Sequence, residues 1–405
     1  MKGEVQKPGA ELSQIGHGIG RCSASFHHAF AIASRLLLSP VALQFKFGRH
    51  AVRLNGDEGK YKTKEGVVSV KAVGYERALP IDDPAALIDV TLPEPVPEPH
   101  DLLVDIKAVS VNPVDTKVRA STNPPSGEIR VLGFDAAGIV REIGRDVSLF
   151  RPGEKVWYAG SIARPGTNAE RHLVDERIVG KMPNKLGFPE AAALPLTSIT
   201  AWELLFDRLQ VLQNPAPVGN QMLVIGASGG VGSILVQLAR KLTSLTIIGT
   251  ASDAESEAHV RERGAHYAIN YNDLKEQLKR IGIPSVTYVA SLTHTGEYLR
   301  TISEVLLPQG RVGIIDDPVG LETMILKPKC ISIHWEFMFT RSLFQTPDMI
   351  EQHKILNRVS ELVDEGSIQP ALAENFGTIN AANLRRAHAA VESGHARGKI
   401  VLEGF

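Results

Sequence analysis

The chain has 405 residues, with 44 Lys and Arg against 45 Asp and Glu, which gives a formal net charge of −1. With 43% hydrophobic and 22% charged residues, it has the composition of a folded globular protein of two or three domains, not that of a disordered or membrane-embedded one. The near-zero charge argues against nucleic acid as the main partner. Two cysteines, Cys22 and Cys330, are too few for a disulfide framework or a four-cysteine zinc lobe, so we expect a reducing compartment such as the cytoplasm.

The first 66 residues differ in composition from the rest of the chain. No Asp or Glu occurs from Leu12 to Gly56, and the apolar stretch from Ala29 to Phe47 is interrupted by Arg35 and Pro40. These interruptions argue against a secretory signal or a membrane span. We therefore expect residues 1–66 to be a disordered extension. A mitochondrial presequence is the alternative, because such peptides are rich in Arg and Ser and poor in acids.

The rest of the chain shows two kinds of secondary-structure pattern. Residues 67–195 predict a β-rich module, because short strand-like runs are separated by turns rich in Pro and Gly. In residues 196–336, strand-like runs alternate with helical patterns, which predicts a doubly wound parallel sheet and assigns the chain to the α/β class. Residues 337–405 carry two helical patterns and end in a short strand.

The strongest chemical signal is a glycine-rich turn between a predicted strand, 221–226, and the helix that follows. Glycines in such a turn let backbone N–H groups approach a pyrophosphate at the positive end of the helix. We expect the turn to bind a dinucleotide, although an alanine replaces the first glycine of the usual fingerprint. The residues of the turn are Ala227, Ser228, Gly229, Gly230, Val231 and Gly232.

The same turn permits two other interpretations. Gly226 to Gly230 also spells the G-x-S-x-G nucleophile elbow of a serine hydrolase, with Ser228 as nucleophile and Asp316 or Asp317 and several histidines following. We favour the dinucleotide interpretation, because Gly232 has no role in an elbow and a β-rich module does not precede one in hydrolases. The third interpretation is a catalytically silent protein that keeps the turn and binds NADPH.

The next strand, 246–251, bears on the choice of cofactor. NAD sites usually place an Asp or Glu at its end to bind the ribose 2′-OH. Here the strand runs into Ala251 and Ser252, which leaves room for the 2′-phosphate of NADPH, and Ser252, Arg261 or Tyr271 could donate to that phosphate. Asp253 either faces the ribose, where it would repel the phosphate, or caps the next helix.

Three stretches and their order resemble the medium-chain dehydrogenase/reductase superfamily. They are SVNPVDTKVR, GFDAAGIV and ASGGVG, and the likeness covers nearly all of Val67 to Phe405. Within the superfamily, the chain is similar to quinone oxidoreductases and to the group called zinc-type alcohol dehydrogenase-like. The resemblance implies a GroES-like catalytic domain at 67–195, completed by 337–405, and a Rossmann domain at 196–336. We expect a homodimer that acts on a small molecule and has neither a nucleic-acid nor a membrane partner.

The zinc ligands of the superfamily are missing from this chain. The zinc enzymes have a cysteine where this sequence has Asn112, and a histidine where it has Phe134, and no cysteine lies between Cys22 and Cys330. A catalytic zinc needs three protein ligands, so we expect none. The resemblance then implies hydride transfer from NADPH to a quinone or to a double bond conjugated to a carbonyl, since these carbons are already electrophilic. Interconversion of an alcohol and a carbonyl compound is the alternative.

Two residues are the candidate catalytic ones. Asn112 is expected to donate a hydrogen bond to the developing enolate oxygen, although it could instead cap the turn before Pro113. Asp115 could orient a ribose or a donor, or could satisfy backbone N–H groups. By resemblance, the cofactor pocket also includes Thr200, Leu292 and Ile314. His334 and Trp335 are expected in the substrate wall.

Overall fold

The computed structural model describes residues 69–213, 220–394 and 398–405. The extension predicted at 1–66 lies outside the described residues. Within them the chain forms three sheets, one of which is wholly parallel, and the predicted α/β class is confirmed. No described helix is long and apolar enough to cross a membrane.

Two sheets form a mainly antiparallel module. A small antiparallel sheet has the order β2-β1-β4, and a larger one has the order β15-β16-β3-β5-β6-β8, with β7 also paired to β3. All pairs of the larger sheet are antiparallel except β15 with β16, which is parallel. Three helices follow or interrupt the strands of this module. Its elements are β1 (Ser69–Tyr75), β2 (Ile88–Pro93), β3 (Asp101–Val111), α2 (Pro113–Ser121), β4 (Arg130–Val131), β5 (Ala136–Ile143), β6 (Lys155–Tyr158), β7 (Arg171–Asp175), β8 (Val179–Lys181), α3 (Phe188–Ala192) and α4 (Pro195–Trp202).

The parallel sheet has the order β11-β10-β9-β12-β13-β14. The chain winds outward from β9 to β11 and then returns to the other side of β9 for β12, β13 and β14, as a doubly wound fold does. The elements are β9 (Gln221–Ile225), α5 (Gly230–Leu242), β10 (Thr246–Ala251), α6 (Ala254–Glu262), β11 (Tyr267–Asn270), α7 (Leu274–Arg280), β12 (Val286–Ser291), α8 (Thr295–Val305), β13 (Leu306–Ile314) and β14 (Ser332–Trp335).

Local sequence explains why α5 begins and ends where it does. Gly229 is its N-cap, and the apolar residues Ile234, Leu235 and Leu238 are buried. Arg240 and Lys241 lie in its last turn, where positive charge favours the negative end of the helix dipole. The positive N-terminal end of α5 therefore has no side-chain cap and lies near the carboxyl end of β9, while the apolar face of the helix packs in the core.

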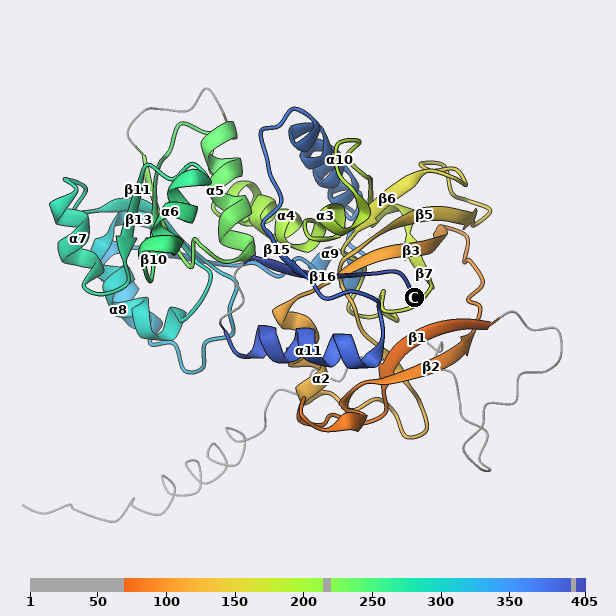
Figure 1. Ribbon diagram of the computed structural model, residues 1–405. Coiled ribbons are helices and arrows are strands. Elements are labelled where there is room, and N and C mark those ends of the chain that lie inside the picture. The colour runs from red at the N-terminus through yellow and green to blue at the C-terminus, as the bar shows by residue number, and fades with distance from the viewer. Residues whose placement is uncertain (1–68, 214–219, 395–397) are drawn as a thin grey trace, which may run out of the picture. The chain divides into compact units, whose positions relative to one another are not determined.

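The C-terminal segment returns to the mainly antiparallel module. Its elements are α9 (Thr340–Phe344), α10 (Glu351–Asp364), β15 (Leu372–Asn375), α11 (Ala381–Glu392) and β16 (Lys399–Glu403). In Figure 1 the dark blue β16 lies beside the orange β3, although the two are far apart in sequence. They pair antiparallel with Ile400 opposite Val111. This register carries Lys399, one residue earlier, to the end of β3, where Asn112 follows. The domain boundaries themselves remain predictions.

Candidate active site

The glycine-rich turn between β9 and α5 has the geometry that a dinucleotide pyrophosphate requires. Gly226 has a φ of +88°, which favours glycine. A Cβ atom at position 232 would lie 2.3 Å from the Gly226 carbonyl oxygen and 2.6 Å from Ala227 Cα, so only glycine fits there. Gly229 begins α5 without a side-chain cap. The first N–H groups of the helix therefore have no intrahelical partner, and they suit a phosphate.

The six residues predicted for phosphate binding all lie in this turn or at the start of α5. Ala227 and Gly232 are buried, and Gly229 is exposed. The other three, Ser228, Gly230 and Val231, are half-buried. The turn thus fits the cofactor, and the role of each residue remains a prediction.

A serine hydrolase would need a base beside Ser228. The serine that a histidine contacts is instead Ser233, whose Oγ lies 2.9 Å from His259 Nε2 and which is buried within α5. Asp316, one of the two candidate acids, accepts hydrogen bonds from the backbone N–H and the hydroxyl of Thr295. These contacts give no support to a nucleophile at Ser228.

The strand order places the turn beside the crevice in which doubly wound folds bind their ligands. The winding reverses between β9 and β12, and ligands bind outside the carboxyl ends of the strands at such a point. Leu292 directly follows β12, and Ile314 ends β13. A Cβ atom at Gly226 would lie 3.3 Å from Leu292 Cβ, so Leu292 borders the turn. Thr200 is buried on α4, and its hydroxyl donates to the Leu196 carbonyl oxygen at 2.8 Å.

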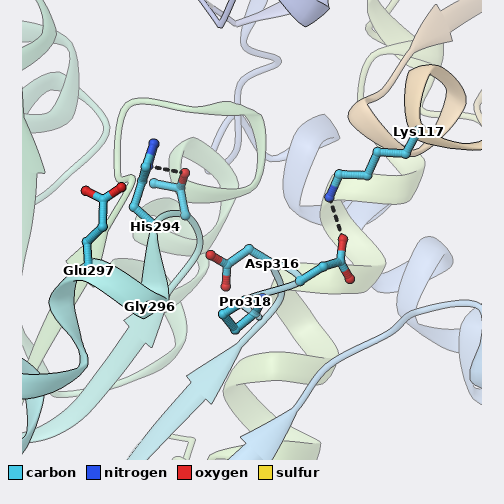
Figure 2. Close-up of a pocket in the computed structure, with 8 residues that line it drawn as sticks. Lys117, His294, Gly296, Glu297, Asp316 and Pro318 are labelled. Carbon is cyan, nitrogen blue, oxygen red and sulfur yellow. Dashed lines mark hydrogen bonds and ion pairs between the residues drawn. The ribbon is translucent and has the colours of Figure 1, made fainter. Parts of the chain in front are cut away.

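A cavity of about 430 Å³ lies at the carboxyl ends of β12 and β13. Figure 2 shows the residues that line it. Lys117 extends over it from α2 and forms an ion pair of 2.6 Å with Asp317, which follows β13. The cavity therefore lies where α2 meets the strand ends of the parallel sheet. Its lining residues are Lys117, Thr293, His294, Gly296, Glu297, Asp316, Asp317 and Pro318.

The end of β10 shows how Asp253 is used. Asp253 is the N-cap of α6, and its Oδ1 accepts from the Ser256 backbone N–H at 2.9 Å. Its Oδ2 accepts from the Ser252 hydroxyl at 3.0 Å. Of the two interpretations of Asp253, the contacts support the helix cap. Ser252 is exposed at the strand end, where the cofactor prediction needs it.

The other two predicted phosphate donors lie in different settings. Arg261 pairs with Glu257 at 2.9 Å on the surface of α6, with both side chains about half exposed. Tyr271 is half-buried just after β11, and its ring lies 6.1 Å from that of Tyr298. A phosphate contact from Arg261 would have to compete with Glu257.

The predicted substrate wall lies on the outermost parallel strand. Trp335 is paired in register with Ile314, the residue that ends β13, and its side chain is 55% exposed. His334 is half-buried, and burial, together with the nearby Arg311 and Arg208, lowers its pKa. Trp335 thus reaches the same strand edge as the predicted cofactor residues, and its contact with substrate remains a prediction.

Asn112 lies in a buried hydrogen-bond network at the start of α2. Its side-chain Nδ2 donates to Asp135 Oδ2 at 2.8 Å, and its Oδ1 accepts from Lys399 Nζ. Lys399 Nζ also donates to Asp135 Oδ2 at 3.0 Å. Ser110 Oγ and the Leu196 backbone N–H donate to the same carboxylate at 3.0 and 2.8 Å. One N–H of the Asn112 amide is left without a partner in this network.

Asp115 has the second of the two roles that its sequence allows. Its Oδ2 accepts from the Asn112 backbone N–H at 2.8 Å, and its Oδ1 accepts from that of Gly133 at 3.0 Å. Burial raises the pKa of Asp115 to about 7, while these donors and the Lys399 ammonium favour the charged form. Asp115 thus fastens the start of α2 to the Gly133 turn, and a direct role in catalysis remains only a prediction.

Two residues of the network were absent from the sequence-based predictions. Asp135 lies within the stretch GFDAAGIV, but nothing local marks it as a partner of Asn112. Lys399 precedes an apolar strand near the C-terminus, and its side chain is only 6% exposed. One signal was available. Lys399 lies at the start of an apolar strand that must be buried, and a buried lysine needs a partner of opposite charge.

The residues at the position of the superfamily's zinc site do not fit a metal. Phe134 is buried and packs edge-on against Phe339, with ring centroids 5.2 Å apart. The Asp115 and Asp135 oxygens already accept from N–H and O–H groups, and the Lys399 ammonium occupies the place of a cation beside Asp135. Across the described ranges, no three His, Cys, Asp or Glu side chains are grouped to hold an ion.

Comparison with protein families gives two matches. The model of the alcohol dehydrogenase GroES-like domain matches residues 98–192, and that of zinc-binding dehydrogenases matches residues 263–402. A zinc-type alcohol dehydrogenase-like protein of Staphylococcus aureus (strain Mu50 / ATCC 700699) is 39% identical over 338 residues, which are 82% of this chain and 99% of that protein. The human mitochondrial NAD(P)H oxidoreductase RTN4IP1 is 30% identical over 334 residues, covering 75% of this chain and 82% of that protein.

Solved structures agree with these matches. A protein of Rhizobium etli CFN 42, provisionally assigned as a zinc-dependent alcohol dehydrogenase, is 55% identical with a TM-score of 0.81, over 83% of this chain and 98% of that one. The quinone oxidoreductase of Escherichia coli, complexed with NADPH, is 25% identical with a TM-score of 0.69, over 82% of this chain and 99% of that one.

The role of Asp115 can be tested with Asp115→Asn. Its pKa of about 7 keeps Asp115 protonated at pH 5, where it has one free carbonyl acceptor as the amide does, so the free energies of unfolding of parent and variant should then differ by less than about 1 kcal/mol. The raised pKa of Asp115 means that the parent's stability from this group is full below about pH 4 and is lost as the pH rises through about 7, whereas the amide does not titrate. The variant should therefore gain stability relative to the parent between pH 5 and pH 8.

Urea unfolding at both pH values measures this effect. Asp146→Asn is a control, because the Asp146 side chain is 49% exposed and lies 3.6 Å from Arg145. A stability difference that does not change with pH, together with lost turnover, would instead give Asp115 a direct catalytic role.

Proposed function

The chain belongs to the medium-chain dehydrogenase/reductase superfamily and to its zinc-type alcohol dehydrogenase-like group, and from that premise we propose that it is an NADPH-dependent reductase of quinones or of double bonds conjugated to a carbonyl, acting without zinc. That it is an oxidoreductase follows from the family. The cofactor preference, the substrate class and the absence of zinc are the proposal.

The observation that carries the proposal is the Asn112 network. Where the zinc enzymes of the superfamily bind a metal, this chain has a buried amide held between Lys399 and Asp135. Such an arrangement offers a hydrogen-bond donor and no Lewis acid. In the zinc enzymes, oxidation of an alcohol relies on the metal as a Lewis acid, whereas reduction of a quinone or an enone needs only stabilisation of the oxygen that becomes negative.

In this proposal, different residues bind the cofactor, contact the substrate oxygen and position the donor. The turn at Ser228 to Gly232 and the free N–H groups at the start of α5 would hold the pyrophosphate, and a reduced nicotinamide, when bound, supplies the hydride. Asn112 would donate its remaining N–H to the substrate oxygen. Asp115 fixes the backbone of Asn112, and the hydroxyl of Thr200 is held by its own helix.

Interconversion of alcohols and carbonyl compounds remains the second candidate, because the names of the Staphylococcus and Rhizobium relatives refer to alcohol dehydrogenases. The donor set around Asn112 argues against it. A screen with NADPH oxidation as the readout, using quinones, enones and simple aldehydes, separates the two candidates. A protein that binds NADPH but turns over none of these compounds would be the silent one.

The remaining expectations belong to the same proposal. We propose a homodimer, supported by the free edge of β14, which ends the parallel sheet and exposes Trp335 and, just beyond it, Phe337. We propose a small molecule as the substrate, with no nucleic-acid or membrane partner. A cytoplasmic location is proposed, with mitochondria as the alternative that depends on residues 1–66.

Preference for NADPH over NADH tests the cofactor proposal. Because Asp253 caps α6 and Ser252 is exposed at the end of β10, the Ser252 hydroxyl should turn from Asp253 Oδ2 to the 2′-phosphate. The charge-assisted hydrogen bond gained corresponds to about tenfold in affinity, at about 1.4 kcal/mol per tenfold. Fluorescence titration of both cofactors measures the ratio, and Ser252→Ala should reduce it by weakening NADPH alone. Equal dissociation constants in the parent would refute the preference.

Replacement of Asn112 tests the chemistry. Asn112→Ala should lower kcat for the best quinone or enone about 100- to 1,000-fold, as loss of one oxyanion donor does, while NADPH affinity stays within a few-fold. Asn112→Asp should be at least as damaging, because it adds a carboxylate beside Asp135 and repels the developing negative charge. If both variants are nearly as fast as the parent at unchanged melting temperature, Asn112 only forms the turn.

A further inference from the structure

Lys399 is a buried ammonium that contacts both modules of the site. Its Nζ donates to Asn112 Oδ1 and to Asp135 Oδ2. Its methylene stem lies beside the start of α5, since a Cβ atom at Gly230 would come within 3.3 Å of Lys399 Cδ and of Thr197 Cγ2. The antiparallel pairing of β16 with β3 fixes its position, because Ile400, the next residue, is opposite Val111.

This ammonium determines which way the Asn112 amide faces. An ammonium has donors only, so the oxygen of the amide must face Lys399 and its NH₂ group must face away. One N–H of that group then donates to Asp135 Oδ2, with 2.8 Å between Nδ2 and Oδ2. Asp135 is itself held by Ser110 Oγ and by the Leu196 backbone N–H. The second hydrogen is left with a fixed direction.

The charge of Lys399 matters as much as its geometry. A carboxylate lies 2.8 Å from the nitrogen that is proposed to stabilise a developing negative charge, so Asp135 alone would oppose that charge. Lys399 neutralises Asp135 at 3.0 Å. A cation at the oxygen end of an amide also polarises its N–H groups and makes them stronger donors.

We infer that Lys399 is a positioning residue for the reaction: it orients and polarises the Asn112 amide and cancels the charge of Asp135 beside it. This inference rests on the proposed function, because Lys399 can assist the reaction only if the Asn112 amide is the donor to the substrate oxygen. In this inference Lys399 acts through Asn112 and Asp135, which its Nζ contacts, and not on the substrate directly.

The test compares Lys399→Met with Lys399→Arg and Asp135→Asn/Lys399→Met. Lys399→Met should lower kcat for 1,4-naphthoquinone about 10- to 100-fold, which is less than loss of the donor itself, while the NADPH dissociation constant stays within about threefold. Lys399→Arg should recover part of the loss, because the charge returns. The double variant should also recover part of the lost kcat, because no unpaired carboxylate remains. It can be measured even if Lys399→Met alone is unstable.

A second readout does not depend on turnover. With ¹⁵N-labelled asparagine, the side-chain amide signal of Asn112, assigned by its absence in Asn112→Asp, should shift in Lys399→Met. Lys275→Met is the matched control, because Lys275 is paired with Glu304 at the surface of the parallel module and should alter neither readout.

The outcomes separate the inference from the proposed function. A parent protein that reduces no quinone or enone contradicts the proposed function, and the amide signal then decides the inference alone. An unchanged Asn112 signal in Lys399→Met overturns the inference. So does a parent-like kcat with NADPH affinity weakened tenfold or more, which would place Lys399 in cofactor binding.

Discussion

The buried ion pair between Lys399 and Asp135 is the interaction on which the rest of the site depends. Loss of one partner of such a pair leaves an uncompensated charge at a cost of about 3–5 kcal/mol, so the two residues must come together whenever the chain folds. The Asn112 amide bridges them, and Asp115 ties the backbone of Asn112 to Gly133. The candidate donor is therefore held in place before any substrate arrives, which is the condition for electrostatic catalysis.

The topology brings this network to the parallel sheet. β16 returns to pair with β3, which puts the Lys399 side chain against the first turn of α5, where the glycines predicted to bind phosphate lie. The Leu196 backbone N–H, at the start of α4, donates to Asp135. Elements before and after the parallel module thus converge on one carboxylate, which couples the candidate donor to the edge where the cofactor would bind.

Local signals were enough to predict the fold class and the place of the glycine-rich turn between β9 and α5. The strand before the turn, the glycines and the helix after it lie in one continuous stretch of sequence, so their geometry follows from nearby residues. The two possible roles of Asp115 could not be separated, because a helix-capping carboxylate and a catalytic one look alike in NPVD. Lys399 and Asp135 could not be predicted as partners of Asn112, since Lys399 is 287 residues from it and only the register of β16 on β3 joins them.

The absence of zinc chemistry is the central claim, and one measurement tests it directly. The full chain is treated with a strong chelator, its metal content is determined by elemental analysis, and the reduction of 1,4-naphthoquinone by NADPH is followed at 340 nm. Since Asn112, Phe134 and the engaged carboxylates offer no ligand set, turnover should be nearly unchanged at well under one zinc per chain. Turnover that falls in proportion to the zinc removed, and returns when zinc is added, would contradict it.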